Sequence, residues 1–128
     1  MKLNFQMAAF NWIVFDGVCP KCLVKTTLRA QCHIGASFDG ENGKIFCNGE
    51  YKLGEKMRWW PINHPRWRDW ITSDRRNTGT ADVARECCYT ECQICGADLY
   101  AVIEFVSLSP RLLIDIGLEE NWPKGFDK

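Results

Sequence analysis

Cys19-Pro20-Lys21-Cys22 and Cys92-Gln93-Ile94-Cys95-Gly96 are the two short stretches that decide how this chain folds. Each contains a Cys-x-x-Cys pair, and 69 residues separate the two pairs. A tight loop lets both sulfur atoms of a pair point at one ion, and two such loops complete a tetrahedron of four thiolates. A site with four protein ligands has no open position for a substrate. The pattern therefore predicts one structural zinc ion on Cys19, Cys22, Cys92 and Cys95.

The separation of the two pairs is wider than the roughly 15–20 residues typical of paired zinc-binding motifs. Lengthening a flexible loop about fourfold costs only about 1.2 kcal/mol. A structural zinc ion contributes roughly 10–16 kcal/mol in small peptides. One shared metal site is therefore the favoured interpretation, in a single domain, 1–128, with a folded insertion at about 30–86 between the pairs.

Around the two pairs the chain resembles the zinc-ribbon and rubredoxin-like class, in which each pair lies beside a strand. The second pair matches the Cys-x-x-Cys-Gly knuckle of that class, where glycine lets backbone amides turn toward sulfur. The first pair departs from it, because Leu23 takes the place of the glycine. The resemblance implies antiparallel hairpins tied by one Cys₄ site. It leaves zinc and iron as alternative metals, since sequence cannot separate them at four thiolates.

The composition is that of an ordinary soluble domain, with 128 residues of which 46% are hydrophobic and 25% charged. Sixteen basic residues balance 16 acidic ones, and a Cys₄ zinc site would bring the net charge to about −2. This balance argues against sequence-independent nucleic-acid binding. Eight cysteines without a recognisable export signal, and no apolar run of the roughly 18–20 residues that cross a bilayer, predict a cytoplasmic protein. A secreted disulfide framework is the alternative.

Alternation of apolar and polar residues predicts a mainly β fold with little helix. Strands are expected at 9–15, 23–34, 44–47, 50–60, 99–108 and 111–118, a strand or short helix at 81–89, and a short helix at 66–71. In the last hairpin the expected turn is Ser109-Pro110. Its second strand is expected to place Leu112, Ile114 and Ile116 on one face.

Residues 56–76 combine four tryptophans with six basic side chains and only two aspartates, so this stretch carries a charge of +4. Tryptophan and arginine are enriched at binding hot spots. The predicted partner-binding residues are Trp59, Trp60, Arg66, Trp67, Arg68 and Trp70. An acidic protein surface fits this composition, and single-stranded nucleic acid is the alternative partner. The alternative is that the tryptophans are buried in the core of an inserted loop and bind no partner.

The remaining cysteines, Cys32, Cys47, Cys87 and Cys88, are expected to pack in the core, with a second metal site that includes His33 as the alternative. On a strand, the adjacent Cys87 and Cys88 would face opposite sides. No paired-histidine zinc motif, nucleophile elbow or dinucleotide fingerprint occurs in the chain, so no enzymatic activity is expected.

The chain is also similar to small bacterial proteins of unassigned function that have two Cys knuckles and a central Tyr-x-Leu-Gly-(Asp/Glu) strand, here residues 51–55. Such small domains include immunity proteins that neutralise a toxin. The expected function is therefore a protein-binding module, which would be an inhibitor, an immunity protein or an adaptor. A nucleic-acid-binding zinc ribbon and a rubredoxin-like or thiol redox protein are the alternatives.

Overall fold

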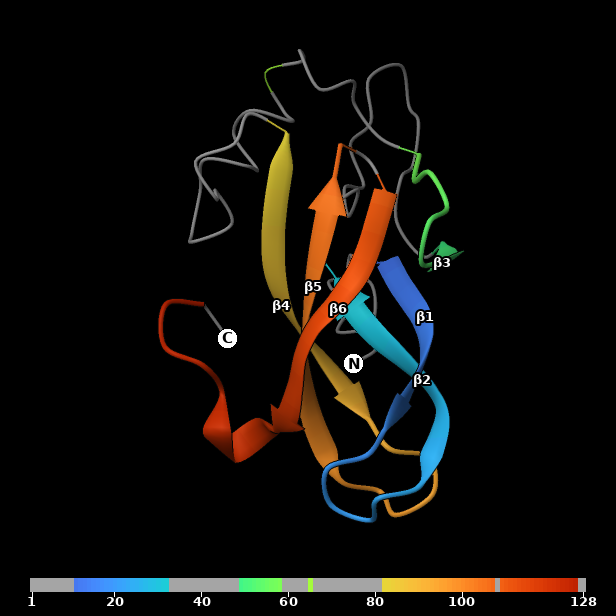
Figure 1. Cartoon of the computed structure of the whole chain (residues 1–128), viewed down its shortest axis with the longest axis vertical. Helices are drawn as coiled ribbons and strands as arrows, with labels where there is room; N and C mark the ends of the chain where they lie inside the picture. The colour runs from blue at the N-terminus through green and yellow to red at the C-terminus, as the bar shows by residue number, and fades with distance from the viewer. Residues whose placement is uncertain (1–10, 33–48, 59–64, 66–81, 108, 127–128) are drawn as a thin grey trace, which may run out of the picture.

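One six-stranded sheet makes up most of the part of the chain that the computed structural model describes, residues 11–32, 49–58, 65, 82–107 and 109–126. The strands are β1 (Asn11–Val18), β2 (Lys25–Cys32), β3 (Glu50–Lys52), β4 (Val83–Glu91), β5 (Asp98–Val106) and β6 (Ser109–Leu118). They lie in the order β3-β1-β2-β4-β5-β6, and a short 3₁₀ helix, η2 (Glu119–Asn121), follows β6 (Figure 1). The prediction of a mainly β fold is confirmed.

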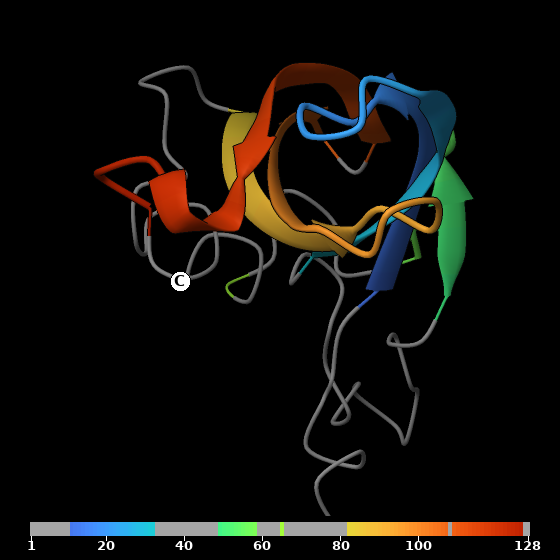
Figure 2. The ribbon, with the colours of Figure 1, turned by 90° about the horizontal axis from the view of Figure 1, so that it is seen from below.

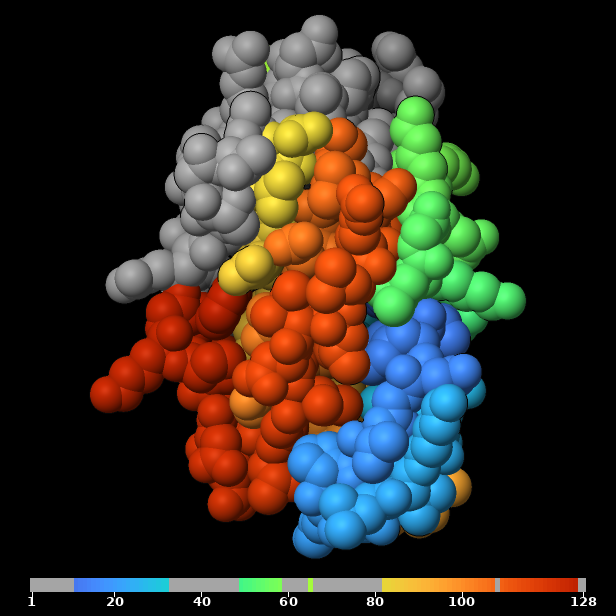
Figure 3. Space-filling model, viewed as in Figure 1, coloured from blue at the N-terminus to red at the C-terminus, as the bar shows by residue number. Residues whose placement is uncertain are grey.

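The sheet is curled so strongly that its two edges approach each other, as the view from below shows (Figure 2). Just after β3, the backbone N–H of Gly54 donates a hydrogen bond to the carbonyl of Pro110 in β6, at 2.7 Å. Residues 49–58 accordingly lie alongside the upper part of β6 (Figure 3). The curl encloses an interior into which every second residue of the long strands points.

The interior is filled by apolar side chains that alternate along the strands with outward-facing residues. The buried set includes Ile13, Phe15, Leu28, Ala30, Cys32, Ala84, Cys88, Leu99, Ala101, Ile103 and Phe105. On the outer face, a second cluster of Cys87, Tyr100 and Val102 is covered by Trp122 and Phe126 from the segment after η2. Cys87 and Cys88 thus face opposite sides and are both buried, as is Cys32, which confirms the prediction of core packing for these three.

Two antiparallel hairpins, β1–β2 and β4–β5, form the part of the sheet that carries the cysteine pairs. Both hairpins turn at the same end of the molecule, the lower end in Figure 1. In each, the first cysteine directly follows the first strand, and the second strand begins three residues after the second cysteine. Because β2 and β4 are adjacent, the two turns are brought close together.

The strand predicted at 50–60 is wrong in length. Among its described residues, 50–58, only Glu50–Lys52 form a strand. β3 pairs with β1 in parallel, so the sheet is mixed rather than purely antiparallel. The chain turns at Gly54, whose φ of 94° favours glycine, and the N–H of Glu55 bonds to the carbonyl of Lys52. After this turn Met57 returns to the core with only 1% of its surface exposed.

The face predicted for β6 is also wrong. Two β-bulges in the β5–β6 pair place Leu113 opposite Ile103 and Pro110 opposite Phe105. Leu112 and Ile114 consequently remain 42% and 39% exposed, whereas Leu113 and Ile116 pack against the core. A bulge adds a residue that a strict period of two does not register. Pro110 lies within β6, and the expected turn at Ser109-Pro110 is replaced by one that begins at Ser107, with φ 53°.

The segment at 81–89, for which strand and helix were both open, forms most of β4. The predicted strand at 44–47 and the predicted helix at 66–71 lie outside the described residues. The folded insertion at about 30–86 stays a prediction. Among the residues described, no helix is long and apolar enough to cross a membrane.

Candidate metal centre

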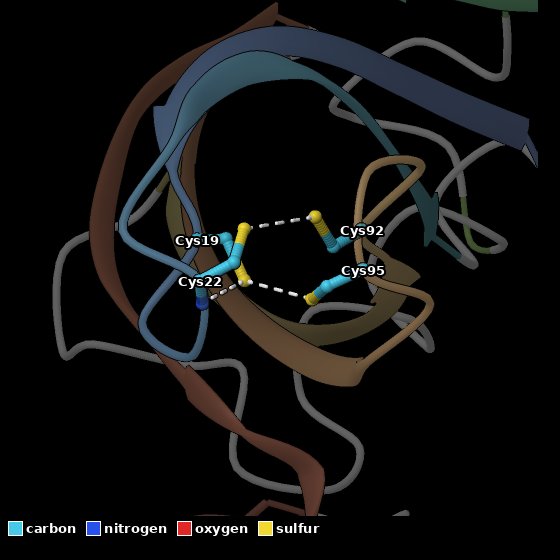
Figure 4. Close-up of side chains that lie close together, drawn as sticks. All are labelled: Cys19, Cys22, Cys92 and Cys95. Atoms are coloured by element: carbon cyan, nitrogen blue, oxygen red, sulfur yellow. Dashed lines mark hydrogen bonds between the residues drawn. The ribbon is translucent and has the colours of Figure 1, made fainter.

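The four cysteines of the two Cys-x-x-Cys pairs meet at the lower end of the sheet, with their sulfur atoms turned toward one another (Figure 4). All four sulfur atoms lie within 4.8 Å of one another. Two contacts cross between the pairs: Cys19 Sγ to Cys95 Sγ at 3.7 Å and Cys22 Sγ to Cys92 Sγ at 3.8 Å. The structure therefore brings together the cysteines predicted to share a metal ion, across the 69 residues that separate the pairs.

These distances fit a tetrahedral metal site and not disulfides. In a tetrahedral site with Zn–S bonds of about 2.3 Å, the edge between two sulfur atoms is about 3.8 Å. A disulfide would require about 2.0 Å, and all four cysteines are free thiols. Cys19 and Cys92 are fully buried, Cys22 is half-buried and Cys95 is exposed. An ion at the centre would thus sit at the boundary between the core and solvent.

The two knuckles, residues 18–25 and 91–98, have the same backbone hydrogen bonds. In the first, Leu23 N–H donates to the Cys19 carbonyl at 2.8 Å and Cys19 N–H donates to the Val24 carbonyl at 3.1 Å. In the second, Gly96 N–H donates to the Cys92 carbonyl at 2.8 Å and Cys92 N–H donates to that of Ala97 at 2.9 Å. Leu23 and Gly96 both have left-handed backbone, with φ of 62° and 77°. The departure of the first pair from the Cys-x-x-Cys-Gly pattern therefore does not alter the shape of its loop.

Exchanging residues at this left-handed position is expected to change stability in opposite directions in the two knuckles. Left-handed backbone costs a residue with a Cβ roughly 1–2 kcal/mol of strain. Glycine avoids this strain, but its greater freedom in the unfolded chain lowers the stability of the folded protein by about 0.5–1 kcal/mol. We expect Leu23→Gly to stabilise the protein by up to about 1 kcal/mol. Gly96→Ala, whose Cβ would meet nothing within 4 Å, should destabilise it by about 1 kcal/mol through backbone strain alone.

Thermal unfolding at low micromolar concentration measures both changes, since about 1 kcal/mol corresponds to a few degrees for a domain of this size. Metal content provides the control, because neither substitution removes a sulfur atom. A lower melting temperature for Leu23→Gly would show that the leucine side chain contributes more to the fold than its backbone strain costs.

The backbone of the first knuckle favours a thiolate on Cys19. Burial opposes ionisation, but the N–H groups of Cys22 and Lys21 donate to Cys19 Sγ at 3.5 and 3.3 Å. Together with the thiols of Cys95 and Cys92, they lower the pKa of Cys19 to about 7. For Cys22 the Val24 backbone favours ionisation, yet burial and the neighbouring thiols raise its pKa to about 11. Four sulfur atoms this close cannot all ionise without a cation among them.

Cys87 and Cys88 are poorly suited to thiol chemistry. Burial, followed by the nearby carboxylates of Glu86 and Asp115, raises the pKa of Cys87 to about 12. Burial likewise raises the pKa of Cys88 well above its usual value. A thiol must ionise to act as a nucleophile or a metal ligand, so these two stay protonated at neutral pH.

The predicted partner-binding residues, Trp59, Trp60, Arg66, Trp67, Arg68 and Trp70, lie outside the described residues, as do Cys47 and His33. Sequence reasoning missed a different feature, namely that apolar side chains of the two knuckles face solvent. Their signal in the sequence was position, because Val18, Leu23, Val24 and Ile94 each lie within two residues of a cysteine of the two pairs. Comparison of the chain with protein-family models, curated proteins and solved structures gives no match.

Proposed function

We propose that this chain is a non-catalytic β domain, stapled by one structural zinc ion on Cys19, Cys22, Cys92 and Cys95, that binds a protein partner. The observation that supports the metal is the set of four sulfur atoms with cross-knuckle distances of 3.7 and 3.8 Å. These equal the edge of a zinc–thiolate tetrahedron, about 3.8 Å. Four thiolates would complete the coordination of the ion and leave no position for a reacting water.

The staple holds the two hairpins at one end of the curled sheet, where few buried apolar side chains lie beyond Leu28 and Leu99. Bound zinc would supply neutralising charge to four thiolates that otherwise repel one another. Because the metal site has a structural role in this proposal, the protein partner would bind elsewhere on the surface of the chain. The +4 stretch of tryptophans and arginines at 56–76 supports an acidic protein as the partner, in the manner of an inhibitor, immunity protein or adaptor.

Metal analysis of protein purified without added metal tests the first half of the proposal. We expect one zinc per chain in a colourless protein. Iron in that position, with the visible absorption of iron–thiolate bonds, would contradict the assignment and favour electron transfer. Metal-free protein with four titratable thiols and an unchanged fold would contradict a structural metal altogether.

Partner binding is tested by isolating complexes from native cells with wild-type protein and with Trp67→Ala/Arg68→Ala. The expected result is one protein, identified by mass spectrometry, that remains bound to wild type and to the exposed-leucine control Leu112→Ser but not to the double variant. Single-stranded DNA and RNA are titrated in parallel across a salt series. Salt-sensitive binding to them, with no protein partner, would overturn the assignment in favour of a nucleic-acid-binding ribbon.

A further inference from the structure

The end of the molecule that holds the four cysteines exposes several apolar side chains. Leu23 is 74% exposed, Ile94 60%, Val18 49% and Val24 42%. All four belong to the two knuckles, whose loops face the viewer in Figure 2. Cys95 is exposed among them. We call these residues the knuckle patch. Grouped apolar side chains at a surface mark an interaction site more often than single exposed ones do.

Leu23 is a second, independent sign of function, because both its backbone conformation and the exposure of its side chain are unfavourable. Its φ of 62° is strained for a residue with a Cβ, and its side chain is the most exposed of the large hydrophobic residues in the described chain. The second knuckle, with the same hydrogen bonds, has glycine at this position. A strained residue that contributes little to the core is typical of a site selected for binding.

The charges of the two knuckles are opposite. Residues 18–25, Val-Cys-Pro-Lys-Cys-Leu-Val-Lys, contain two lysines and no acidic residue. Residues 91–98, Glu-Cys-Gln-Ile-Cys-Gly-Ala-Asp, contain two acidic residues and no basic one. Lys21, Lys25, Glu91 and Asp98 are all exposed. Beside the second knuckle a hollow of about 510 Å³ is lined by Asp98, Glu119 and Glu120, with Lys21 also contributing. The knuckle end is therefore complementary in charge to a copy of itself turned by 180°.

We propose that the knuckle patch is the interface of a two-fold symmetric homodimer, in which the first knuckle of each copy packs against the second knuckle of the other. In such an interface the same surface contacts itself, so each lysine-bearing loop faces an acidic loop twice. Leu23 and Val24 are buried against the partner's Ile94, and the exposed Cys95 edge of the metal centre is covered. A net charge near zero gives little long-range repulsion between copies. This dimer requires the knuckle geometry but is independent of the protein partner proposed above.

Analytical ultracentrifugation of the metal-loaded full chain, with reductant, measures the dimer between 1 and 200 μM. Wild type is expected to dimerise reversibly, and Leu23→Gly is expected to weaken the dimer at least tenfold. Leu23→Gly is informative because relief of strain should leave the monomer at least as stable, so loss of the dimer cannot be ascribed to misfolding. Leu112→Ser, at an apolar residue of β6 that is 42% exposed outside the patch, should dimerise as wild type does.

Charge reversal tests the orientation of the two copies. Lys21→Glu/Lys25→Glu and Glu91→Lys/Asp98→Lys should each be monomeric alone, because like charges would face each other. An equimolar mixture of the two variants should form a heterodimer, since every facing pair is again opposite in sign. Zinc content of one per chain in each variant confirms that the knuckles are intact.

Three outcomes would overturn the proposal. Wild type that stays monomeric at 200 μM with its metal bound has no such interface. A dimer that survives Leu23→Gly uses another surface. A mixture of charge variants that fails to associate, although each is folded and monomeric, contradicts the pairing of opposite knuckles.

Discussion

Chelation of the metal from reduced protein is expected to lower the melting temperature by roughly 15–25 °C. This corresponds to a loss of about 5 kcal/mol in a domain of this size. The loss should be smaller than the roughly 10–16 kcal/mol of zinc-finger peptides, because those peptides have little other core. Here the buried apolar side chains between the strands, among them Ile13 and Phe105, do not depend on the metal. The sheet should therefore loosen at the knuckle end first.

Replacement of a single sulfur separates the role of the metal from that of cysteine burial. Cys92→Ser should lose most of the metal and approach the melting temperature of the chelated protein. Cys32→Ala removes a sulfur that is equally buried but is not one of the four clustered sulfurs, so it should cost only about 1 kcal/mol and keep one metal per chain. Calorimetry with metal analysis distinguishes the two. Equal melting temperatures for Cys92→Ser and wild type would refute the structural role of the metal.

Truncation of Phe105 is expected to destabilise the protein by about 3–5 kcal/mol, the usual cost of removing a buried aromatic ring. Phe105 is fully buried and lies opposite Ala84 on β4 and Pro110 on β6, toward the end of the sheet away from the cysteines. The small facing side chain of Ala84 leaves room for the ring, and Phe105→Ala would leave a cavity that none of these neighbours is large enough to fill.

Denaturant unfolding measures this loss, and Phe105→Leu serves as the matched control, with an expected cost of about 1 kcal/mol. Both variants should keep their metal, because the cavity opens far along β5 from Cys95. A variant that loses metal in proportion to stability would show that the two ends of the sheet unfold as one cooperative unit. A cost below that of the leucine variant would contradict the packing described here.

Local patterns predicted those parts of the fold that depend on neighbouring residues. Alternation predicts a strand at 99–108, and a strand places Leu99, Ala101, Ile103 and Phe105 on one side; all four are fully buried. The spacing of the two Cys-x-x-Cys pairs likewise identified the four cysteines that the structure brings together. In both cases the signal lies within one strand or one loop, where side-chain direction follows directly from position in the sequence.

Features that depend on distant residues could not be predicted in this way. The parallel pairing of β3 with β1 and the contact of Gly54 with Pro110 arise from the curl of the whole sheet. The bulges that turn Leu113 inward in place of Leu112 depend on how β6 meets β5. Leu23 is a third case, since leucine itself disfavours left-handed backbone and only the closure of the knuckle imposes it.

The identical spacing of the two hairpins has a kinetic consequence for metal loading. Each hairpin closes through contacts between near neighbours and can present two thiols before the sheet is complete. The pairing of β2 with β4 joins residues far apart in the sequence, and contacts of that kind form more slowly. Until β2 and β4 have paired, an ion held by one knuckle can bind the second knuckle of its own chain or that of another chain. Dilute chains supplied with one equivalent of metal should therefore refold in highest yield, and excess metal should trap half-sites and cross-link chains.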